Sequence, residues 1–212
     1  MQKAGCNDPK LTELEHIPGQ AFVKTGCFIP VPGGRLPEVN EIILLPGAHR
    51  NYRGGIHEGI DFYSYSNNKR IPCGEAVINV CDSWIVRVDS DWMPMSPDEY
   101  LRITESLKLK YDDKLLDRLR GKQVWTETED GTIFRYCHLQ EISRDIRLGK
   151  RVLAGTKLGT VGNTGTEGGA MGTGGNCHLH FEAWPTPSAY LGKGMGYRDA
   201  REEFVKLFRK TE

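Results

Sequence analysis

The stretch Cys177-His178-Leu179-His180-Phe181-Glu182 decides the fold that we predict for this chain. Side chains two positions apart on a β-strand point to the same face, so we expect His178 and His180 to face one common space. The residues between them point to the opposite face, where they can pack in a core. A run rich in glycine and threonine, residues 162–175, precedes the motif and lets the backbone bend closely around that space. Two imidazoles on one face indicate a metal site, although two solvated histidines on a half-buried strand would give the same pattern.

Two other segments contain further residues of the types that bind metals. His57 and Asp61 are four positions apart and are flanked by glycines. His138 lies in the alternating strand pattern Tyr136-Cys137-His138-Leu139, which follows a turn signal at Asp130-Gly131. Four of the six histidines therefore fall in three glycine-flanked β segments.

Zinc chemistry explains why these residue types would converge. A catalytic zinc takes three protein ligands from histidine, aspartate or glutamate and keeps a fourth position for water. His57, Asp61 and either His178 or His180 would supply two imidazoles and one carboxylate. The remaining histidine of the pair and His138 would then be free to act on the water and the substrate.

The three motifs, in this order, resemble those of the lysostaphin-type zinc endopeptidases of bacterial cell walls: His57-x-x-x-Asp61, Tyr136-x-His138-Leu139 and His178-Leu179-His180-Phe181-Glu182. The resemblance extends from about Glu41 to Trp184 and includes the glycine-punctuated run from Val152 to Gly165. It implies a mainly β fold, the antiparallel sheets or sandwich of the duplicated hybrid motif. It also implies hydrolysis of peptide bonds in peptidoglycan cross-bridges or stem peptides, and a location in the cell envelope or outside the cell.

The resemblance also assigns roles to the site residues. It implies Zn²⁺ bound by His57, Asp61 and His180, with His138 and His178 catalytic. We expect His178 to be the general base because it shares a face with His180. His138 would stabilise the oxyanion, although the sequence allows these two roles to be exchanged.

Two carboxylates compete with the histidines for the role of base. Glu58 and Glu182 each lie close to a histidine along the chain. On a strand, Glu182 would share the face of His180, so a hydrogen bond that orients this ligand is an alternative role for it.

Composition limits the other function classes. The 212 residues are enough for one sizeable core, and 28 basic residues balance 28 acidic ones. A nucleic-acid binder would show a basic excess, so we expect no nucleic acid partner. We also expect no transmembrane segment, because no apolar run approaches the length of a membrane span. Residues 1–9 are polar and show no export signal, so the expected location depends on the resemblance alone.

The six cysteines leave several interpretations open. They could form disulfides in an exported protein, stay as thiols, or act as small buried apolar residues. Cys137 and Cys177 each precede a site histidine, so on neighbouring strands they could form a disulfide behind the site. Cys73 and Cys81 cannot pair along one straight strand, because eight residues span about 26 Å. Zinc ligation by cysteine is disfavoured, because a Cys-His dipeptide on a strand cannot direct both side chains to one ion.

The order of elements predicts three regions. We expect an N-terminal arm over residues 1–40, a zinc peptidase core over 41–190 and a C-terminal helix within 191–212. Within the arm, residues 21–32 could form one extended strand. In the core we predict strands over residues 41–45, 60–65, 75–80 and 84–88, and a hairpin of 122–128 with 132–139. The C-terminal helix should cover 197–210 and place its apolar residues on one side, namely Phe204, Leu207 and Phe208.

A helical insertion is predicted over residues 96–121, within the segment 91–121. Ser96-Pro97-Asp98-Glu99 is typical of a helix start, and Gly121 can end the last turn. Apolar residues between these limits have helical spacing: Tyr100, Ile103, Leu107, Leu115, Leu116 and Leu119. The insertion could pack on the sheet, roof the substrate groove or bind a protein partner, and packing is the favoured interpretation.

Some features of the chain leave the specificity and the function open. Arg50 or Arg53 could bind a substrate carboxylate, although solvated loop charges are the favoured interpretation. The loop 165–176 is longer than the corresponding run in the family that the chain resembles. A non-catalytic cell-wall-binding or regulatory protein on the same fold is an alternative function, and such a protein would be expected to lack ligands. A sugar-phosphate carrier domain is another, but it would not need Asp61.

Overall fold

The computed structural model describes residues 26–66 and 70–208 of the chain. In this part, the strands form a two-stranded, a three-stranded and a six-stranded sheet, and every pairing is antiparallel. The prediction of a mainly β fold with antiparallel sheets is therefore confirmed. The strands are β1 (His49–Arg50), β2 (Gly55–Ile56), β3 (Ile60–Phe62), β4 (Ala76–Ile78), β5 (Ser83–Val88), β6 (Val124–Glu127), β7 (Ile133–Cys137), β8 (Leu139–Ile142), β9 (Arg151–Val152), β10 (Lys157–Val161) and β11 (Leu179–Trp184).

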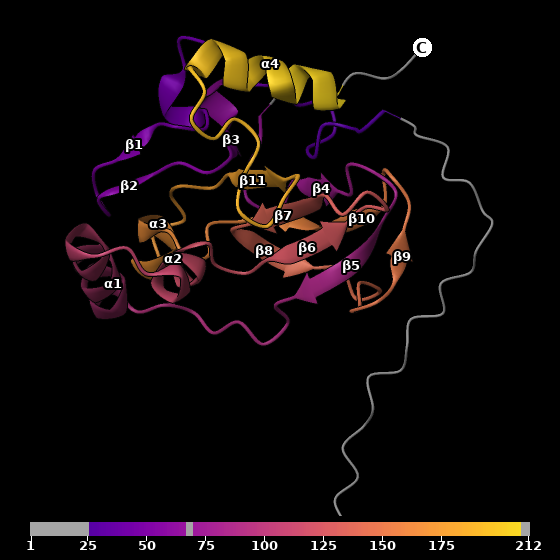
Figure 1. The fold of residues 1–212 in the computed structure, drawn as a ribbon. Helices are drawn as coiled ribbons and strands as arrows, with labels where there is room; N and C mark the ends of the chain where they lie inside the picture. The colour runs from indigo at the N-terminus through magenta and orange to yellow at the C-terminus, as the bar shows by residue number, and fades with distance from the viewer. Residues whose placement is uncertain (1–25, 67–69, 209–212) are drawn as a thin grey trace, which may run out of the picture.

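Helices cover two sides of these sheets (Figure 1). The helices are α1 (Pro97–Leu109), α2 (Asp113–Leu119), α3 (Glu167–Ala170) and α4 (Tyr197–Phe208), with short 3₁₀ turns η1 (Ile42–Leu44) and η2 (Ser64–Ser66). Figure 1 shows α1, α2 and α3 together at one end of the molecule, and α4 across another side, above β3 and β11. No helix of the described residues is both long and apolar enough to cross a membrane.

The six-stranded sheet has the order β3-β11-β7-β6-β5-β9, so β11 lies between β3 and β7. The register places His180 directly opposite Asp61 on one side and opposite Cys137 on the other. Because β7 ends at Cys137, the next residue, His138, emerges beside the same end of β11. Strand pairing thus brings three remote segments of the chain to one place.

The opposite face of β11 belongs to the main hydrophobic core. Leu179, Phe181 and Ala183 alternate with the polar residues of this strand and are buried. The ring of Phe181 lies 5.3 Å from that of Tyr136 and 6.4 Å from that of Phe204 on α4. Burial of a large apolar side chain contributes about 1.5–3 kcal/mol, so α4 helps to hold β11 in place.

The helical insertion begins as predicted. The Ser96 side chain accepts a hydrogen bond from the Glu99 N–H at 3.2 Å and caps α1, and Asp112 caps α2 in the same way. However, the buried side chains of the insertion do not join the main core. They form a separate cluster with α3, made of Met95, Tyr100, Ile103, Leu107, Leu119 and Ala170. The insertion therefore has a small core of its own, and it contacts the sheet through ion pairs such as Asp117 with Arg87 on β5.

Some strand predictions near the N-terminus are wrong. Residues 42–44 form η1 and not a strand, with backbone hydrogen bonds from Leu44 and Leu45 to residues three positions earlier. Among the described residues no strand pairs with this segment, and its backbone groups bond within the turn or to side chains such as Arg50. The strand predicted over 60–65 ends at Phe62 and continues as η2. Of the strand predicted over 21–32, residues 21–25 lie outside the described residues, and 26–32 form no strand.

The disulfides differ from the one considered from the sequence. Cys73 is joined to Cys177, and Cys27 is joined to Cys81. The thiol of Cys137 is free and buried, 3.5 Å from the Gln123 Oε1 atom, so a Cys137–Cys177 bridge is wrong. The register explains the difference, because Cys137 lies opposite His180 and Cys177 stands before the first residue of β11.

Candidate metal centre

Three buried side chains bring one donor atom each to a common point. His57 Nε2 lies 3.0 Å from Asp61 Oδ1 and 2.9 Å from His180 Nδ1. The third distance, from His180 Nδ1 to Asp61 Oδ1, is 2.8 Å. Two imidazole nitrogens and one carboxylate oxygen therefore form a compact triangle of possible metal ligands.

In each histidine ring of the triangle, the other nitrogen makes a hydrogen bond. These two hydrogen bonds decide whether the nitrogens in the triangle can bind a cation. His57 Nδ1 lies 2.9 Å from the Leu45 carbonyl oxygen, which can only accept, so Nδ1 donates and Nε2 has the lone pair. His180 Nε2 donates in the same way to Glu182 Oε1 at 2.9 Å, and its Nδ1 has the lone pair. Two lone pairs and a carboxylate oxygen thus face one another. The donor set fits a zinc ion with three protein ligands.

The pKa values of the two rings agree with this fit. Burial lowers the pKa of His57 to about 4, so its ring is neutral at physiological pH. Burial acts in the same direction on His180, but the hydrogen bonds to Asp61 and Glu182 outweigh it and raise the pKa. A proton and a cation therefore compete for His180 Nδ1, as expected for a metal ligand.

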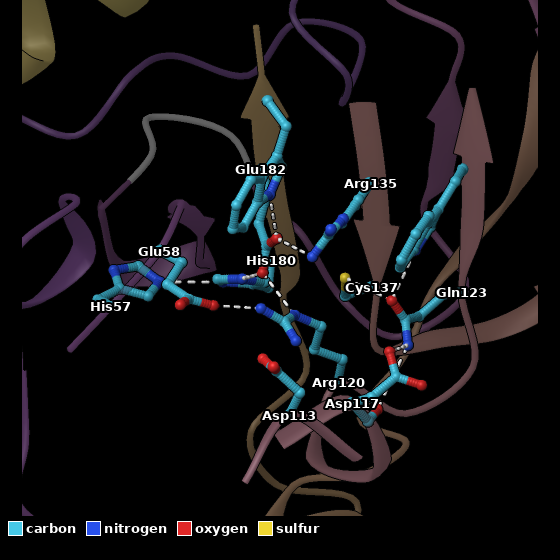
Figure 2. Close-up of polar contacts among 12 residues, drawn as sticks. His57, Glu58, Asp113, Asp117, Arg120, Gln123, Arg135, Cys137, His180 and Glu182 are labelled. Atoms are coloured by element: carbon cyan, nitrogen blue, oxygen red, sulfur yellow. Dashed lines mark hydrogen bonds and ion pairs between the residues drawn. The ribbon is translucent and has the colours of Figure 1, made fainter. Parts of the chain in front are cut away.

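Glu182 is fully buried and accepts four hydrogen bonds. Its Oε1 atom accepts from His180 Nε2 at 2.9 Å and from Arg120 Nε at 2.6 Å. Its Oε2 atom accepts from Arg135 Nη1 at 3.1 Å and from Trp184 Nε1 at 2.6 Å. Figure 2 shows these contacts converging on the carboxylate. Burial opposes its ionisation, but the charge of Arg120 and the other donors keep the pKa of Glu182 well below its usual value. A carboxylate so engaged orients His180 and is a poor general base.

The two remaining histidines face the triangle. His178 Nδ1 lies 2.7 Å from the Asn176 carbonyl oxygen, and its Nε2 lies 3.7 Å from Asp61 Oδ1. His138 Nδ1 lies 2.8 Å from the Thr164 carbonyl oxygen. The rings of His138 and His178 are 4.6 Å apart between centroids. Burial lowers the pKa of both rings, so each presents an unprotonated Nε2 near the triangle.

The backbone of His138 is unusual for a histidine. Its φ of 61° lies in the left-handed region, between the end of β7 and the start of β8. Its N–H donates to the Arg120 carbonyl oxygen at 2.9 Å. Non-glycine residues adopt this conformation rarely, and residues in such sparsely populated conformations cluster at functional sites.

The two arginines near His57 are not solvated loop charges. Arg50 Nη2 lies 2.7 Å from Asp61 Oδ2, and its Nη1 donates to the Ile43 carbonyl oxygen. Arg53 is buried and donates to the Ile56 carbonyl oxygen at 2.7 Å. The favoured interpretation is therefore corrected. Arg50 does bind a carboxylate, namely that of Asp61.

Reasoning from the sequence missed two residues that shape the site. The Tyr63 ring stacks on His178 at 4.2 Å between centroids and 10° between planes. Its position two residues after Asp61 is a signal that could have found it. Arg120 gave no such signal, because both of its carboxylate partners, Glu58 and Glu182, are 62 residues away in the chain.

A groove of about 410 Å³ opens over these residues. Tyr52, Tyr63 and Tyr65 line it. Tyr100 of α1 and Leu116 and Leu119 of α2 also line it, so the insertion does form part of its wall. The histidines of the site line the same groove: His57, His138, His178 and His180.

The model of Peptidase family M23 matches residues 55–190 of the chain. The chain belongs to Peptidase family M23. The resemblance to the lysostaphin-type enzymes is thereby confirmed, and the M23 match covers the three motifs, the insertion and β11. No curated protein sequence matches the chain.

Several solved structures are similar to this M23 chain. A zinc-containing peptidase from Vibrio cholerae is 20% identical, with a TM-score of 0.42, over 78% of this chain and 37% of its own. The catalytic domain of lysostaphin from Staphylococcus simulans is also 20% identical, with a TM-score of 0.42, over 69% of this chain and 85% of its own. A putative M23 peptidase from Pseudomonas aeruginosa is 19% identical, with a TM-score of 0.45, over 89% of this chain and 54% of its own. The chain thus spans about a third of the Vibrio protein and about half of the Pseudomonas protein.

Proposed function

We propose that this M23 chain is a zinc-dependent endopeptidase that hydrolyses peptide bonds in the cross-bridges or stem peptides of bacterial peptidoglycan. The observation that supports this most strongly is the triangle of His57 Nε2, Asp61 Oδ1 and His180 Nδ1, with sides of 2.8–3.0 Å. Family membership supports the reaction class and the substrate.

The same three atoms would hold the zinc. When bound there, zinc polarises a water molecule and the scissile carbonyl and lowers the pKa of that water. The hydrogen bonds from His57 Nδ1 to Leu45 and from His180 Nε2 to Glu182 fix both rings with the binding nitrogen turned inwards.

His178 is the proposed general base. Its Nδ1–H is held by the Asn176 carbonyl oxygen, so Nε2 is free to take the proton of the attacking water. The Asp61 carboxylate, 3.7 Å away, favours the protonated ring that results. His178 then returns the proton to the leaving amine, and the peptide bond is hydrolysed without net loss of protons from the protein.

His138 is the proposed stabiliser of the oxyanion. Its Nδ1–H is held by the Thr164 carbonyl oxygen, so Nε2 donates to an oxyanion only when the ring has gained a second proton. Solvent in the open groove would supply that proton, the developing negative charge would favour it, and the proton would return to solvent when the oxyanion collapses. The rings of His138 and His178 are 4.6 Å apart between centroids, which supports the proposal that both act on one carbonyl.

We propose a location outside the cytoplasm, in the envelope or the medium. Family membership supports it, and so do the disulfides Cys27–Cys81 and Cys73–Cys177, because such bonds persist in oxidising compartments. We also propose residues 41–190 as the peptidase core, with an N-terminal arm and a C-terminal helix on either side.

Purified sacculi of several wall types test the activity. The protein should release new amino termini, with zinc content measured on the same sample. A chelator should abolish the release, and added Zn²⁺ should restore it. Chelator-resistant cleavage would refute the mechanism, and wall binding by a zinc-loaded sample without new amino termini would support the non-catalytic alternative.

A further inference from the structure

The helical insertion ends at a buried arginine that contacts the neighbours of two metal ligands. Arg120 follows α2, and only 7% of it is exposed. Its Nε donates to Glu182 Oε1 at 2.6 Å, and its Nη2 pairs with Glu58. Glu58 follows His57 in the chain, and Glu182 holds the ring of His180. The guanidinium of Arg120 therefore lies between Glu58, which follows His57, and Glu182, which binds the ring of His180 (Figure 2).

We propose that Arg120 is a positioning residue for the zinc site. It orients His180 through Glu182, and it sets the spacing of the two ligand-bearing segments through Glu58. This inference depends on the zinc site of the proposed function. It assigns to the insertion a part in metal binding, in addition to its place in the wall of the groove.

Arg120 and Arg135 both pair with Glu182, but they bind different oxygens of its carboxylate. Arg135 is stacked between Trp125 and Trp184, at 4.0 and 4.2 Å from the ring centroids, and it binds Glu182 through Oε2. Arg120 binds Oε1, the same oxygen that accepts from His180. Removal of the Arg120 side chain therefore disturbs Glu182 Oε1, the oxygen that binds His180. Glu182 Oε2 keeps its hydrogen bond from Arg135.

A backbone contact extends the role of Arg120 to His138. The Arg120 carbonyl oxygen accepts a hydrogen bond from the His138 N–H. Arg120 therefore contacts Glu58 and Glu182 through its side chain and His138 through its backbone. Side-chain substitution keeps this carbonyl group. The zinc affinity is thus the appropriate measurement for the side chain, and turnover alone is not.

The experiment measures the affinity for Zn²⁺ by competition with a chromophoric chelator. The variants are Arg120→Met, Arg120→Lys, Glu182→Gln, and the double variant of Arg120→Lys with Glu182→Gln. Arg118→Met is the matched control, because Arg118 lies in the same helix and pairs with Glu99 instead. Arg120→Met should weaken Zn²⁺ binding by about 10–100-fold, as is typical when a partner of a metal ligand is lost. Arg120→Lys should weaken it less, and Arg118→Met should stay within about twofold of wild type, because the partly buried Arg118–Glu99 pair involves neither Glu58 nor Glu182.

The double variant tests the route through Glu182. If Arg120 acts through this carboxylate, the double variant should lose little more affinity than the weaker-binding single variant, and additive losses would refute that route. Should Arg120→Met fail to fold by circular dichroism, Arg120→Lys decides, because it keeps the positive charge. Wild-type affinity in the folded Arg120 variants, or an equal loss in Arg118→Met, would overturn the inference. A wild-type protein that binds no zinc would instead refute the proposed function, and this inference with it.

Discussion

His57 Nε2 and His180 Nδ1 lie 2.9 Å apart, although 123 residues separate them in the chain. Neither atom has a proton to share in the neutral rings, because the opposite nitrogen of each ring donates to an oxygen. Asp61 stands opposite His180 across two paired strands and adds a carboxylate oxygen. A proton on His180 Nδ1 or a cation between the three atoms accounts for this geometry, and the donor set fits a cation.

Loss of a ligand and loss of a catalytic histidine should have different effects. His57→Ala or Asp61→Ala should release zinc and abolish activity. His138→Ala should keep zinc and lower kcat by about 10²–10⁴-fold, the usual contribution of acid–base or oxyanion groups. Metal analysis and kinetics on the same preparations distinguish the two. Full zinc occupancy in both ligand variants would contradict the assignment.

The Cys73–Cys177 disulfide should matter for both stability and turnover. It closes a sequence separation of 104 residues and ends one residue before His178. The double variant with Cys73→Ser and Cys177→Ser should lose about 2–4 kcal/mol of unfolding free energy, and kcat should also fall.

The second disulfide supplies the control for this prediction. The double variant Cys27→Ser with Cys81→Ser removes a disulfide that spans 54 residues, and neither cysteine is next to a site histidine in the chain. This variant should lose stability by thermal denaturation but keep its turnover well below the melting temperature. Equal losses of kcat in the two double variants would show that the first disulfide has no specific effect on His178.

Gly121 should tolerate no side chain. Its φ is +70°, and a Cβ atom there would lie 2.1 Å from the Thr164 carbonyl oxygen, which accepts from His138. Gly131 has a φ of +81° but has open space around it. Gly131→Ala should therefore cost about 1 kcal/mol of backbone strain, whereas Gly121→Ala should cost about 3 kcal/mol or more.

Turnover separates these two glycine variants further. Displacement of the Thr164 carbonyl group should move the His138 ring, so Gly121→Ala should lower kcat while zinc is retained. Gly131→Ala should keep the wild-type kcat. Chemical denaturation and kinetics at saturating Zn²⁺ measure both effects, and equal stability of the two variants would contradict the predicted clash.

The Arg87–Asp117 pair should make stability depend on acid pH. Both oxygens of Asp117 accept from Arg87 at 2.8 Å. Burial raises the pKa of this carboxyl group, but the hydrogen bonds from Arg87 and Gln123 outweigh burial and lower it below 3.8. The folded state therefore gains stability from the ionised group above the unfolded pKa, and this gain is lost as pH falls through the folded pKa.

Substitution of either partner tests this pH dependence. Asp117→Asn and Arg87→Met should each lose about 1 kcal/mol at neutral pH, and the double variant should lose little more. As the pH falls below about 3.9, the usual pKa of an unfolded aspartate, the difference between wild type and Asp117→Asn should shrink. Urea denaturation at several pH values measures it, and a difference that grows on acidification would contradict the predicted sign.

Much of the local structure follows from local sequence. The helix start at Ser96 and the hairpin that ends at His138 depend on capping and turn residues a few positions apart, so both were predictable. Residues 41–45 were mispredicted because a short apolar run fits a strand or a turn equally well, and only the absence of a partner strand decides between them.

The sequence by itself determined the residue types and spacing of the site: a His-x-x-x-Asp pair, a His-x-His pair and a lone histidine. It predicted each on a β segment, but His57 and His138 stand between strands in the structure. Only the tertiary structure decided that Cys177 pairs with Cys73, that Arg50 binds Asp61 and that Arg120 joins Glu58 to Glu182. The physical reason is the distance along the chain over which each kind of interaction acts. Alternation and capping act over a few residues, whereas a disulfide or a buried ion pair depends on which distant segments the strand register places in contact.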